Sequence, residues 1–334
     1  KEGSMASETV LFASAPDAAS IYEVSMRDGL QNEARTLPLG DKLALLDALL
    51  GSGLRRVELT SFVSPTWIPQ LADADALAQA VGARSIPPGA VLSALCPNAR
   101  GLARALAVGL REIAVFVSAS ETHNKKNVNR TIEESLAGFE AVVAPARAAG
   151  VAVRAYVSCV WGCPYEGDVD ERAAAAIAKR LLALGCYQVS LGDTIGAGTP
   201  RQTARIVERF LGELPVDAVA LHMHDTRGTA LANVLAGLEL GVRHFDASVG
   251  GLGGCPYAAG AAGNVATEDL VYLLEGMGVR TGLSLPALVE AAQVASRVVG
   301  RVLPGKVHRA GPLRREGAPN FAPESAASSS KATP

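Results

Sequence analysis

The sequence predicts an α/β protein folded as a closed (β/α)8 barrel with an additional C-terminal helical segment. Three observations lead to this prediction. Short apolar runs alternate strictly with helical patterns, and eight such runs can be counted along the chain. Alternation of this kind is typical of a parallel sheet with helical crossovers. The eight units together span roughly 250 residues, the usual size of an eight-stranded barrel.

The predicted strands come at regular intervals, with helix-like stretches between them, several of which end in glycine, as helices commonly do. The strands are expected over residues 20–26, 55–62, 90–96, 112–118, 151–160, 187–193, 218–225 and 243–251. A further helical stretch after residue 285 is expected to pack outside the repeat. An open, doubly wound sheet is the alternative, but the first strand is followed by RDGLQNE rather than by the glycine-rich phosphate turn of that fold.

Length and composition suit one large catalytic domain. The chain has 334 residues, of which 49% are hydrophobic, and a net charge of −2. We expect residues 1–18 to be a tag scar and N-terminal extension, residues 19–311 to form the barrel with its C-terminal helix, and residues 312–334, rich in Pro, Ser and Ala, to be a disordered tail. Near-neutral charge and 4% aromatic residues argue against a nucleic-acid partner. No apolar run approaches the roughly 18 to 20 residues of a membrane span.

The five cysteines show no spacing typical of a disulfide framework, so a reduced, cytoplasmic protein is expected. Cys159 and Cys163 stand four residues apart and could form half of a metal site. No second half follows them in the sequence.

Polar residues stand where the predicted strands end, and reactive groups of such barrels gather at the C-terminal ends of the strands. Few of these residue types belong in an apolar core. They are Arg27 and Asp28 after the first strand, Glu58 on the second, Asp193 on the sixth, His222 and His224 on the seventh, and Asn264 where the eighth helix should begin.

The segment LHMHD predicts a metal site. Residues two apart on a strand point the same way, so His222 and His224 can face one ion, although two histidines bonded to backbone partners are the plainer alternative. Asp28 and Asn264 belong to neighbouring units of a closed barrel. Two imidazoles with two hard oxygen ligands suit octahedral Mg²⁺ or Mn²⁺ better than tetrahedral Zn²⁺.

Two arginines have two possible roles each. Arg27 could close the barrel mouth in a salt bridge, or it could stabilise an oxyanion, since its charge is permanent. Arg154 alternates with Tyr156 on the fifth strand, which gives that strand one polar face. Pairing of Arg154 with Glu58 or Asp193 and contact with an anionic substrate remain equally open. After the fourth strand, Lys125 and Lys126 are expected in an exposed basic loop.

Six segments together resemble the hydroxymethylglutaryl-CoA lyases. They are EVSMRDGLQNE (23–33), ELTSFVSPTWIPQLAD (58–73), VSCVWGCPYEG (157–167), SLGDTIGAGTP (190–200), LHMHDTRGTALAN (221–233) and SVGGLGGCPYAAGAAGNVATED (248–269). The resemblance runs from about residue 19 to residue 300. RDG and HxHD are shared by the wider group of metal-dependent Claisen-type TIM barrels, whereas the glycine-rich segment is much more specific to the lyases. One departure is Ser25-Met26, where the family usually has Gly-Pro.

This resemblance implies a retro-Claisen cleavage of 3-hydroxy-3-methylglutaryl-CoA to acetoacetate and acetyl-CoA, dependent on a divalent cation. It also implies a homodimer. In similar lyases the cation would be held by Asp28, His222, His224 and Asn264, Arg27 would face the thioester carbonyl, and Glu58 would be its essential partner. Residues around the acyl group would be Gln31, Asn127, Arg154, Tyr156, Ser190 and Asp193.

Cys255 stands in the glycine-rich segment 248–264, an unusual place for a residue that is commonly buried. A thiol with an ordinary pKa near 8.5 can protonate an enolate carbon, and glycines permit a loop to close over a substrate. A thiol that merely fills a tight turn is the alternative. His222 or Asp28 is expected to be the base that takes the hydroxyl proton, and the sequence does not choose between them.

Two other functions remain possible at this point. Another metal-dependent Claisen-type lyase, synthase or aldolase, acting on a different acyl-CoA or 2-oxo acid, would share RDG and HxHD but would not need Cys255. A metal-binding scaffold on a degenerate barrel would be expected to have lost ligands or acid–base residues.

Overall fold

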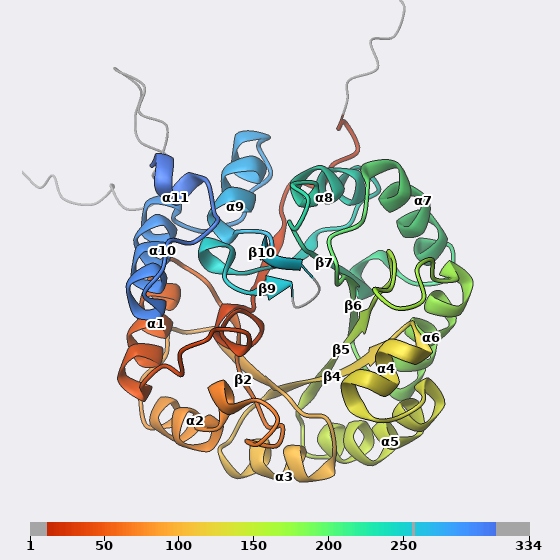
Figure 1. The fold of residues 1–334 in the computed structure, drawn as a ribbon, viewed down its shortest axis with the longest axis horizontal. Coiled ribbons are helices and arrows are strands. Elements are labelled where there is room, and N and C mark those ends of the chain that lie inside the picture. Colours follow the sequence, from red (N-terminus) through yellow and green to blue (C-terminus); the bar gives the residue numbers. More distant parts are fainter. Residues whose placement is uncertain (1–11, 256–257, 312–334) are drawn as a thin grey trace, which may run out of the picture.

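Eight parallel strands close into a barrel in the order β1 to β8, which confirms the predicted fold (Figure 1). The computed structural model describes residues 12–255 and 258–311, with the backbone alone described at residues 255 and 258–261. The barrel strands are β1 (Ser20–Glu23), β2 (Arg56–Ser61), β3 (Val91–Leu95), β4 (Glu112–Ser118), β5 (Ala152–Ser158), β6 (Gln188–Asp193), β7 (Val219–Met223) and β8 (His244–Ala247).

Helices surround the barrel and cover the outer face of its strands (Figure 1). The helices that connect successive strands, or follow the last one, are α1 (Leu39–Gly51), α2 (Ala74–Gly82), α3 (Ala99–Ala107), α5 (Ile132–Ala148), α6 (Glu171–Leu184), α7 (Pro200–Leu211), α8 (Ala230–Glu239) and α9 (Thr267–Gly276). Short 3-10 turns complete the connections at η2 (Pro69–Leu71), η3 (Val216–Ala218) and η4 (Val249–Gly251).

The additional C-terminal segment forms α10 (Leu285–Val299) and the short α11 (Val307–Ala310). Helix α10 packs against α1 and α9, so it closes the ring of helices where the first and last units of the barrel meet. No helix in the described part of the chain is long and apolar enough to cross a membrane.

Alternation along the strands divides apolar from polar side chains. On β5, Val153, Ala155 and Val157 belong to the hydrophobic core, while Arg154 and Tyr156 alternate with them and reach side chains of other strands inside the barrel. Successive side chains of a strand point to opposite faces, which accounts for this division. The interior of the barrel is therefore polar, and its polar side chains extend toward the C-terminal ends of the strands.

The first unit differs from its prediction. Strand β1 ends at Glu23 rather than at residue 26, and Arg27 and Asp28 lie on a single π-helical turn, η1 (Ser25–Gly29). The buried carboxylate of Glu23 explains the change of direction, because its Oε1 accepts hydrogen bonds from the backbone N–H groups of both Ser25 and Val249. Single π turns are frequent at functional sites, and this one aims two charged side chains into the barrel mouth.

The expected basic loop after β4 is instead a helix, α4 (Glu121–Val128). Ser120 caps its first turn by accepting a hydrogen bond from the backbone N–H of His123. Asn129 ends it in the left-handed conformation, with φ of 55°. Lys125 and Lys126 are exposed on this helix, as expected for a solvent-facing segment.

The glycine-rich segment after β8 forms η4 and then a small hairpin of β9 (Gly254–Cys255) and β10 (Ala258–Ala262). Part of the expected loop thus forms antiparallel strands. Helix α9 begins at Thr267, three residues after Asn264, so Asn264 precedes the helix rather than starting it.

Candidate metal centre and active site

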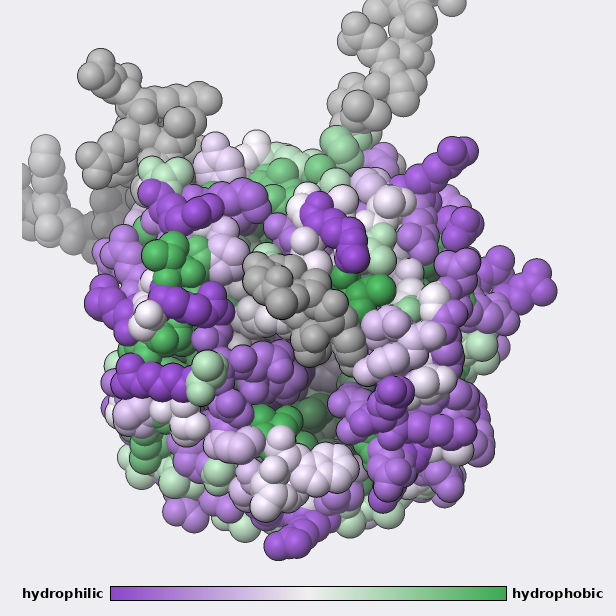
Figure 2. Space-filling model, in the orientation of Figure 1, coloured by the Kyte–Doolittle hydropathy of each residue, from purple (hydrophilic) through white to green (hydrophobic). Residues whose placement is uncertain are grey.

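A cavity of about 710 Å³ opens at the C-terminal end of the barrel, where such barrels place their active sites. Figure 2 shows the opening on the face that Figure 1 presents, with hydrophilic side chains along much of its rim. Its lining combines charged groups, including Arg27 and Asp28, with apolar side chains such as Leu95 and Phe116. This combination suits a ligand with a charged head and an apolar arm.

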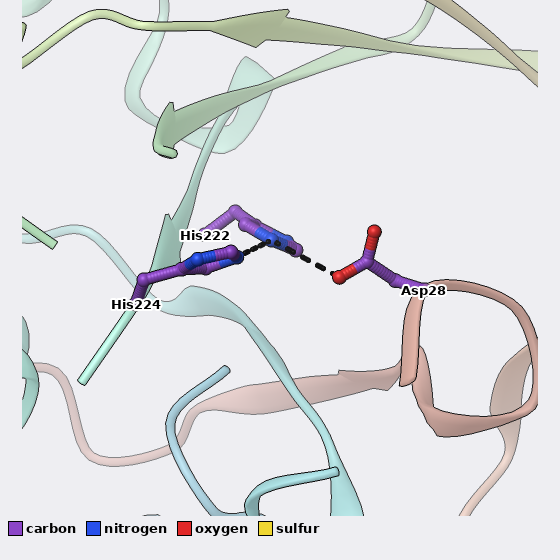
Figure 3. Close-up of side chains that lie close together, drawn as sticks. All are labelled: Asp28, His222 and His224. Atoms are coloured by element: carbon purple, nitrogen blue, oxygen red, sulfur yellow. Dashed lines mark hydrogen bonds and ion pairs between the residues drawn. The ribbon is translucent and has the colours of Figure 1, made fainter. Parts of the chain in front are cut away.

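Three predicted metal ligands meet at one side of this cavity (Figure 3). Nε2 of His222 lies 3.2 Å from Nε2 of His224 and 4.0 Å from Oδ2 of Asp28. An octahedral ion with ligands at about 2.1 Å separates neighbouring donors by about 3 Å and opposite donors by about 4.2 Å. Two imidazole nitrogens and a carboxylate at these separations fit a divalent cation. Among the described residues, no other three histidine, cysteine or carboxylate side chains bring their ligand atoms within 4.8 Å of one another.

Asn264 lies beside this group. Its Nδ2 donates to Oδ2 of Asp28 at 2.8 Å and to the carbonyl oxygen of Leu252 at 3.1 Å. Its backbone bridges that of His224, so the chain after the hairpin runs alongside the second histidine. Gly253 permits this approach, since a Cβ there would lie 2.8 Å from Nδ2 of Asn264 and the backbone has φ of 119°. The fourth predicted ligand is therefore adjacent to the other three.

Arg27 is held between two carboxylates. Its Nε donates to Oε2 of Glu58 and its Nη1 to Oδ1 of Asp28, each at 2.6 Å. The hydroxyl of Tyr156 donates to the same Oε2 of Glu58 at 3.1 Å, and the Tyr156 ring lies beneath the guanidinium at 5.3 Å. Within the described chain, Nη2 of Arg27 makes no hydrogen bond, which leaves a cationic donor at the cavity.

The charges around the site favour ionised Asp28 and neutral His224. Burial is the largest single influence on Asp28 and opposes its ionisation, but Arg27, the neighbouring histidines and the hydrogen bond from Asn264 together lower the pKa of that carboxyl to about 2. Burial, the largest cause, and the neighbouring imidazole of His222 lower the pKa of His224 to about 4. Burial raises the pKa of Glu58 despite the opposing charge of Arg27. At neutral pH, Asp28 and His224 are thus both in the form that binds a cation.

The predicted substrate-binding residues fall into two groups. Gln31, Asn127, Tyr156 and Ser190 line the cavity, as does Arg27. Arg154 and Asp193 do not line it. The carboxylate of Asp193 accepts hydrogen bonds from the backbone N–H groups of Ala197 and Gly198, both at 2.9 Å, so it shapes the loop after β6. Of the two pairings considered for Arg154, neither occurs, because its partner is Asp246.

The predicted catalytic thiol belongs to a residue whose side chain lies outside the described part of the chain. The backbone places Cys255 on β9, directly after Gly254, which lines the cavity. The predicted tail, residues 312–334, and residues 1–11 of the N-terminal extension also lie outside the described residues.

Sequence reasoning missed two residues at the site. Asp246 is fully buried on β8 and accepts a hydrogen bond from Nδ1 of His222 at 3.2 Å. Its place at the end of a barrel strand, in HFDA, was a signal of the same kind that identified Asp193. Trp67 lines the cavity with 63% of its surface exposed, and tryptophan is enriched at binding interfaces.

Comparison with known proteins agrees with this geometry. The family described as HMGL-like matches residues 18–295. The chain belongs to the HMGL-like family. It is 49% identical to the mitochondrial hydroxymethylglutaryl-CoA lyase of Bos taurus over 295 residues, which cover 88% of this chain and 90% of that protein.

Two further HMGL-like proteins are informative. A 3-hydroxy-3-isohexenylglutaryl-CoA/hydroxymethylglutaryl-CoA lyase of Pseudomonas aeruginosa is 48% identical, over 86% of this chain and 94% of that protein. The structure of an HMG-CoA lyase from Acinetobacter baumannii in complex with coenzyme A and 3-methylmalate matches with a TM-score of 0.84 and 37% identity, covering 92% of this chain and 98% of that one. The family resemblance inferred from the six sequence segments is confirmed.

Proposed function

We propose that this chain is a divalent-metal-dependent lyase that cleaves 3-hydroxy-3-methylglutaryl-CoA to acetoacetate and acetyl-CoA. The observation that carries the proposal is the meeting of Asp28, His222 and His224 beside Arg27 at the mouth of the barrel. The extensive identity to hydroxymethylglutaryl-CoA lyases gives the reaction. Coenzyme A in the related Acinetobacter baumannii structure supports an acyl-CoA as the ligand of the cavity.

The cation is proposed to be Mg²⁺ or Mn²⁺, held by Asp28, His222, His224 and Asn264. Hard oxygen donors combined with imidazole nitrogens suit these ions. When bound, the cation supplies Lewis-acid chemistry, lowering the pKa of the tertiary hydroxyl of the substrate and fixing its orientation. The base that accepts the proton of that hydroxyl is assigned to His222 or Asp28. Nε2 of His222 lies 4.0 Å from Oδ2 of Asp28.

Arg27 is proposed to stabilise the enolate that forms as the carbon–carbon bond breaks. Negative charge develops on the thioester oxygen, and a fixed cationic donor stabilises that charge more in the transition state than in the ground state. Glu58 and Asp28 hold the guanidinium on two sides, and its Nη2 remains available to the substrate. The donor therefore needs no reorganisation during the reaction.

Cys255 is proposed to give the enolate carbon its proton, which completes acetyl-CoA. The neighbouring Gly254 lines the cavity, which supports a location of the thiol close to the substrate. The remaining cavity residues, Gln31, Asn127, Tyr156 and Ser190, are proposed to surround the acyl group. The contacts of Arg154 and Asp193 support a role in holding other residues in place, Asp246 and the loop after β6 respectively, and not in binding the substrate.

The decisive experiment measures acetoacetate release from 3-hydroxy-3-methylglutaryl-CoA with Mg²⁺ or Mn²⁺, and again after treatment with EDTA. Release that requires the cation is expected. A folded protein that binds Mn²⁺ without releasing acetoacetate would contradict the proposal and would favour another Claisen-type reaction or a scaffold.

A substrate with a longer 3-alkyl group is a second candidate. The relative from Pseudomonas aeruginosa is named for a 3-isohexenyl substrate as well as the methyl one. The cavity also has an apolar wall that includes Leu95, Phe116 and Phe139. Comparing kcat/KM for the 3-methyl and 3-isohexenyl thioesters tests this candidate, which requires a higher value for the longer substrate.

Assembly and location complete the proposal. The family resemblance supports a homodimer, which a mass measurement by light scattering would test. The four cysteines with described side chains are all free thiols, which supports the proposed cytoplasmic location with its reducing conditions. Fractionation of the source cells would test that location.

A further inference from the structure

A buried ionic unit lies beside the four proposed cation ligands, Asp28, His222, His224 and Asn264, which we call the metal group. It consists of Arg154 on β5, Ser190 on β6 and Asp246 on β8, and each of these residues is fully buried or nearly so. Nη2 of Arg154 donates to Oδ1 of Asp246 at 2.6 Å, and Nη1 donates to Oδ2 at 3.2 Å. The hydroxyl of Ser190 donates to the same Oδ2 at 2.7 Å. The third nitrogen of Arg154, Nε, is satisfied by Oε1 of Gln188 at 2.9 Å.

One contact of this unit leads to the metal group. Oδ2 of Asp246 also lies 3.2 Å from Nδ1 of His222. The two residues are direct neighbours in the register between β7 and β8, so the backbone of the sheet fixes their spacing. Asp246 already accepts three hydrogen bonds, two from Arg154 and one from Ser190. Its ionised carboxylate has no proton to donate and can only accept from His222. Nδ1 of His222 must therefore carry a proton, and in the neutral ring its Nε2 presents the lone pair that a cation can bind.

That lone pair faces the other proposed ligands. Nε2 of His222 is the atom 3.2 Å from Nε2 of His224 and 4.0 Å from Oδ2 of Asp28. We infer that Asp246 is a positioning residue that fixes the tautomer and ring orientation of His222 for cation binding, and that Arg154 and Ser190 hold Asp246 in place. This inference rests on the proposed function, because it assigns a role toward the proposed cation.

The alternative is that the unit only stabilises the barrel. A buried ion pair is a weak source of stability, because removing two charges from water offsets most of their attraction. Support of a ligand accounts for the contact with His222, which an ion pair formed for packing alone would not require. Carboxylates that orient metal-binding histidines in this way typically change metal affinity 10- to 100-fold when they are mutated.

The test measures Mn²⁺ binding to the metal-free protein by calorimetry, without reference to turnover. Asp246→Asn keeps the shape of the side chain but replaces one acceptor by a donor in a site surrounded by donors. We expect its affinity for Mn²⁺ to fall about 10- to 100-fold. Ser190→Ala removes one of the three donors that hold Asp246, and a smaller loss in the same direction is expected.

Glu112→Gln is the matched control. Glu112 is likewise a buried barrel carboxylate paired with an arginine, Arg56, but it contacts no residue of the metal group. A loss of Mn²⁺ affinity in Asp246→Asn without a similar loss in Glu112→Gln separates positioning from general stability. Equal affinity in wild type and Asp246→Asn would overturn the inference.

The tautomer gives a second readout, which does not depend on the variants folding equally well. The chain has five histidines, so nitrogen-15 spectra of the imidazoles are simple enough to assign. The wild-type His222 ring should show a protonated Nδ1, and Ser190→Ala should increase the population of the other tautomer. A wild-type ring protonated at Nε2 instead would overturn the inference. Failure of the wild-type protein to bind Mn²⁺ would overturn the proposed metal-dependent function itself.

Discussion

Nε of Arg27 lies 2.6 Å from Oε2 of Glu58, and the Glu58 side chain is completely buried. The guanidinium at the cavity is therefore held from behind by a carboxylate that the substrate does not reach. We expect Glu58→Gln to lower kcat about 100-fold, because the loss of charge loosens the position of Arg27. Affinity for Mn²⁺ should change far less than kcat. Steady-state kinetics with calorimetry measure both, and Tyr156→Phe, which removes one donor to Glu58 but leaves the charge of Glu58 in place, should have a smaller effect on kcat.

Replacement of the thiol separates binding from turnover. We expect Cys255→Ala to bind the substrate normally and to lose about 10²- to 10⁴-fold in kcat, the usual contribution of a positioned acid. Cys186→Ala is the control, since Cys186 is a buried free thiol that does not line the cavity. Near-normal turnover in Cys255→Ala would remove this residue from the mechanism and would weaken the assignment to the lyase reaction.

Acid should destabilise the metal-free protein through His224. The pKa of this histidine falls from 6.5 to about 4 on folding. Between these values the unfolded chain binds a proton that the folded chain does not, so stability falls as the pH is lowered. In this window His224 lowers the free energy of unfolding by about 1.4 kcal/mol for each unit that the pH falls. Below pH 4 its contribution changes no further.

Thermal unfolding in EDTA at several pH values measures this effect. His224→Asn should reduce the dependence of Tm on pH between 6.5 and 4, since the titrating group is gone. Other groups, including His123 and His244, remain in both proteins and cancel in the comparison. An identical slope in wild type and variant would show that His224 is not neutral in the folded metal-free protein.

The two tryptophans give a binding assay for coenzyme A. Trp67 lines the cavity and is 63% exposed, whereas Trp161 is 3% exposed and donates its ring N–H to Oγ1 of Thr203. We expect coenzyme A to quench the emission of the wild-type protein and of Trp161→Phe, but not of Trp67→Phe. Quenching that persists in Trp67→Phe would place the ligand away from this rim. Titration of the three proteins provides the comparison.

The sequence predicted the barrel and three members of the metal group because their signals are local. Regular alternation reveals the strands, and two histidines at a spacing of two reveal a shared direction. The π turn at Arg27 was not predictable in this way. It depends on a hydrogen bond from the backbone N–H of Val249 to Glu23, residues that are 226 positions apart.

Arg154 illustrates the same limit. Alternation along β5 indicated an inward-facing arginine, but depth within the barrel and the choice of partner depend on the assembled sheet. Its partner Asp246 is 92 residues further along the chain, and its place at the end of a strand does not reveal which side chain it pairs with. Sequence reasoning therefore identified the polar interior and assigned part of it to the substrate, whereas the contacts link Arg154 to a metal ligand.

The metal group combines residues from the first and the last units of the barrel. Asp28 follows β1, His222 and His224 come from β7 and the residue just beyond it, and Asn264 follows β8, so the group spans the seam where β8 pairs with β1. During synthesis from the N-terminus, the complete set of ligands exists only after the last strand has left the ribosome. A cation bound there would hold the first and last units of the barrel together. A chain that stopped short of β8 could not assemble the site. Metal uptake would then report that the whole barrel has closed.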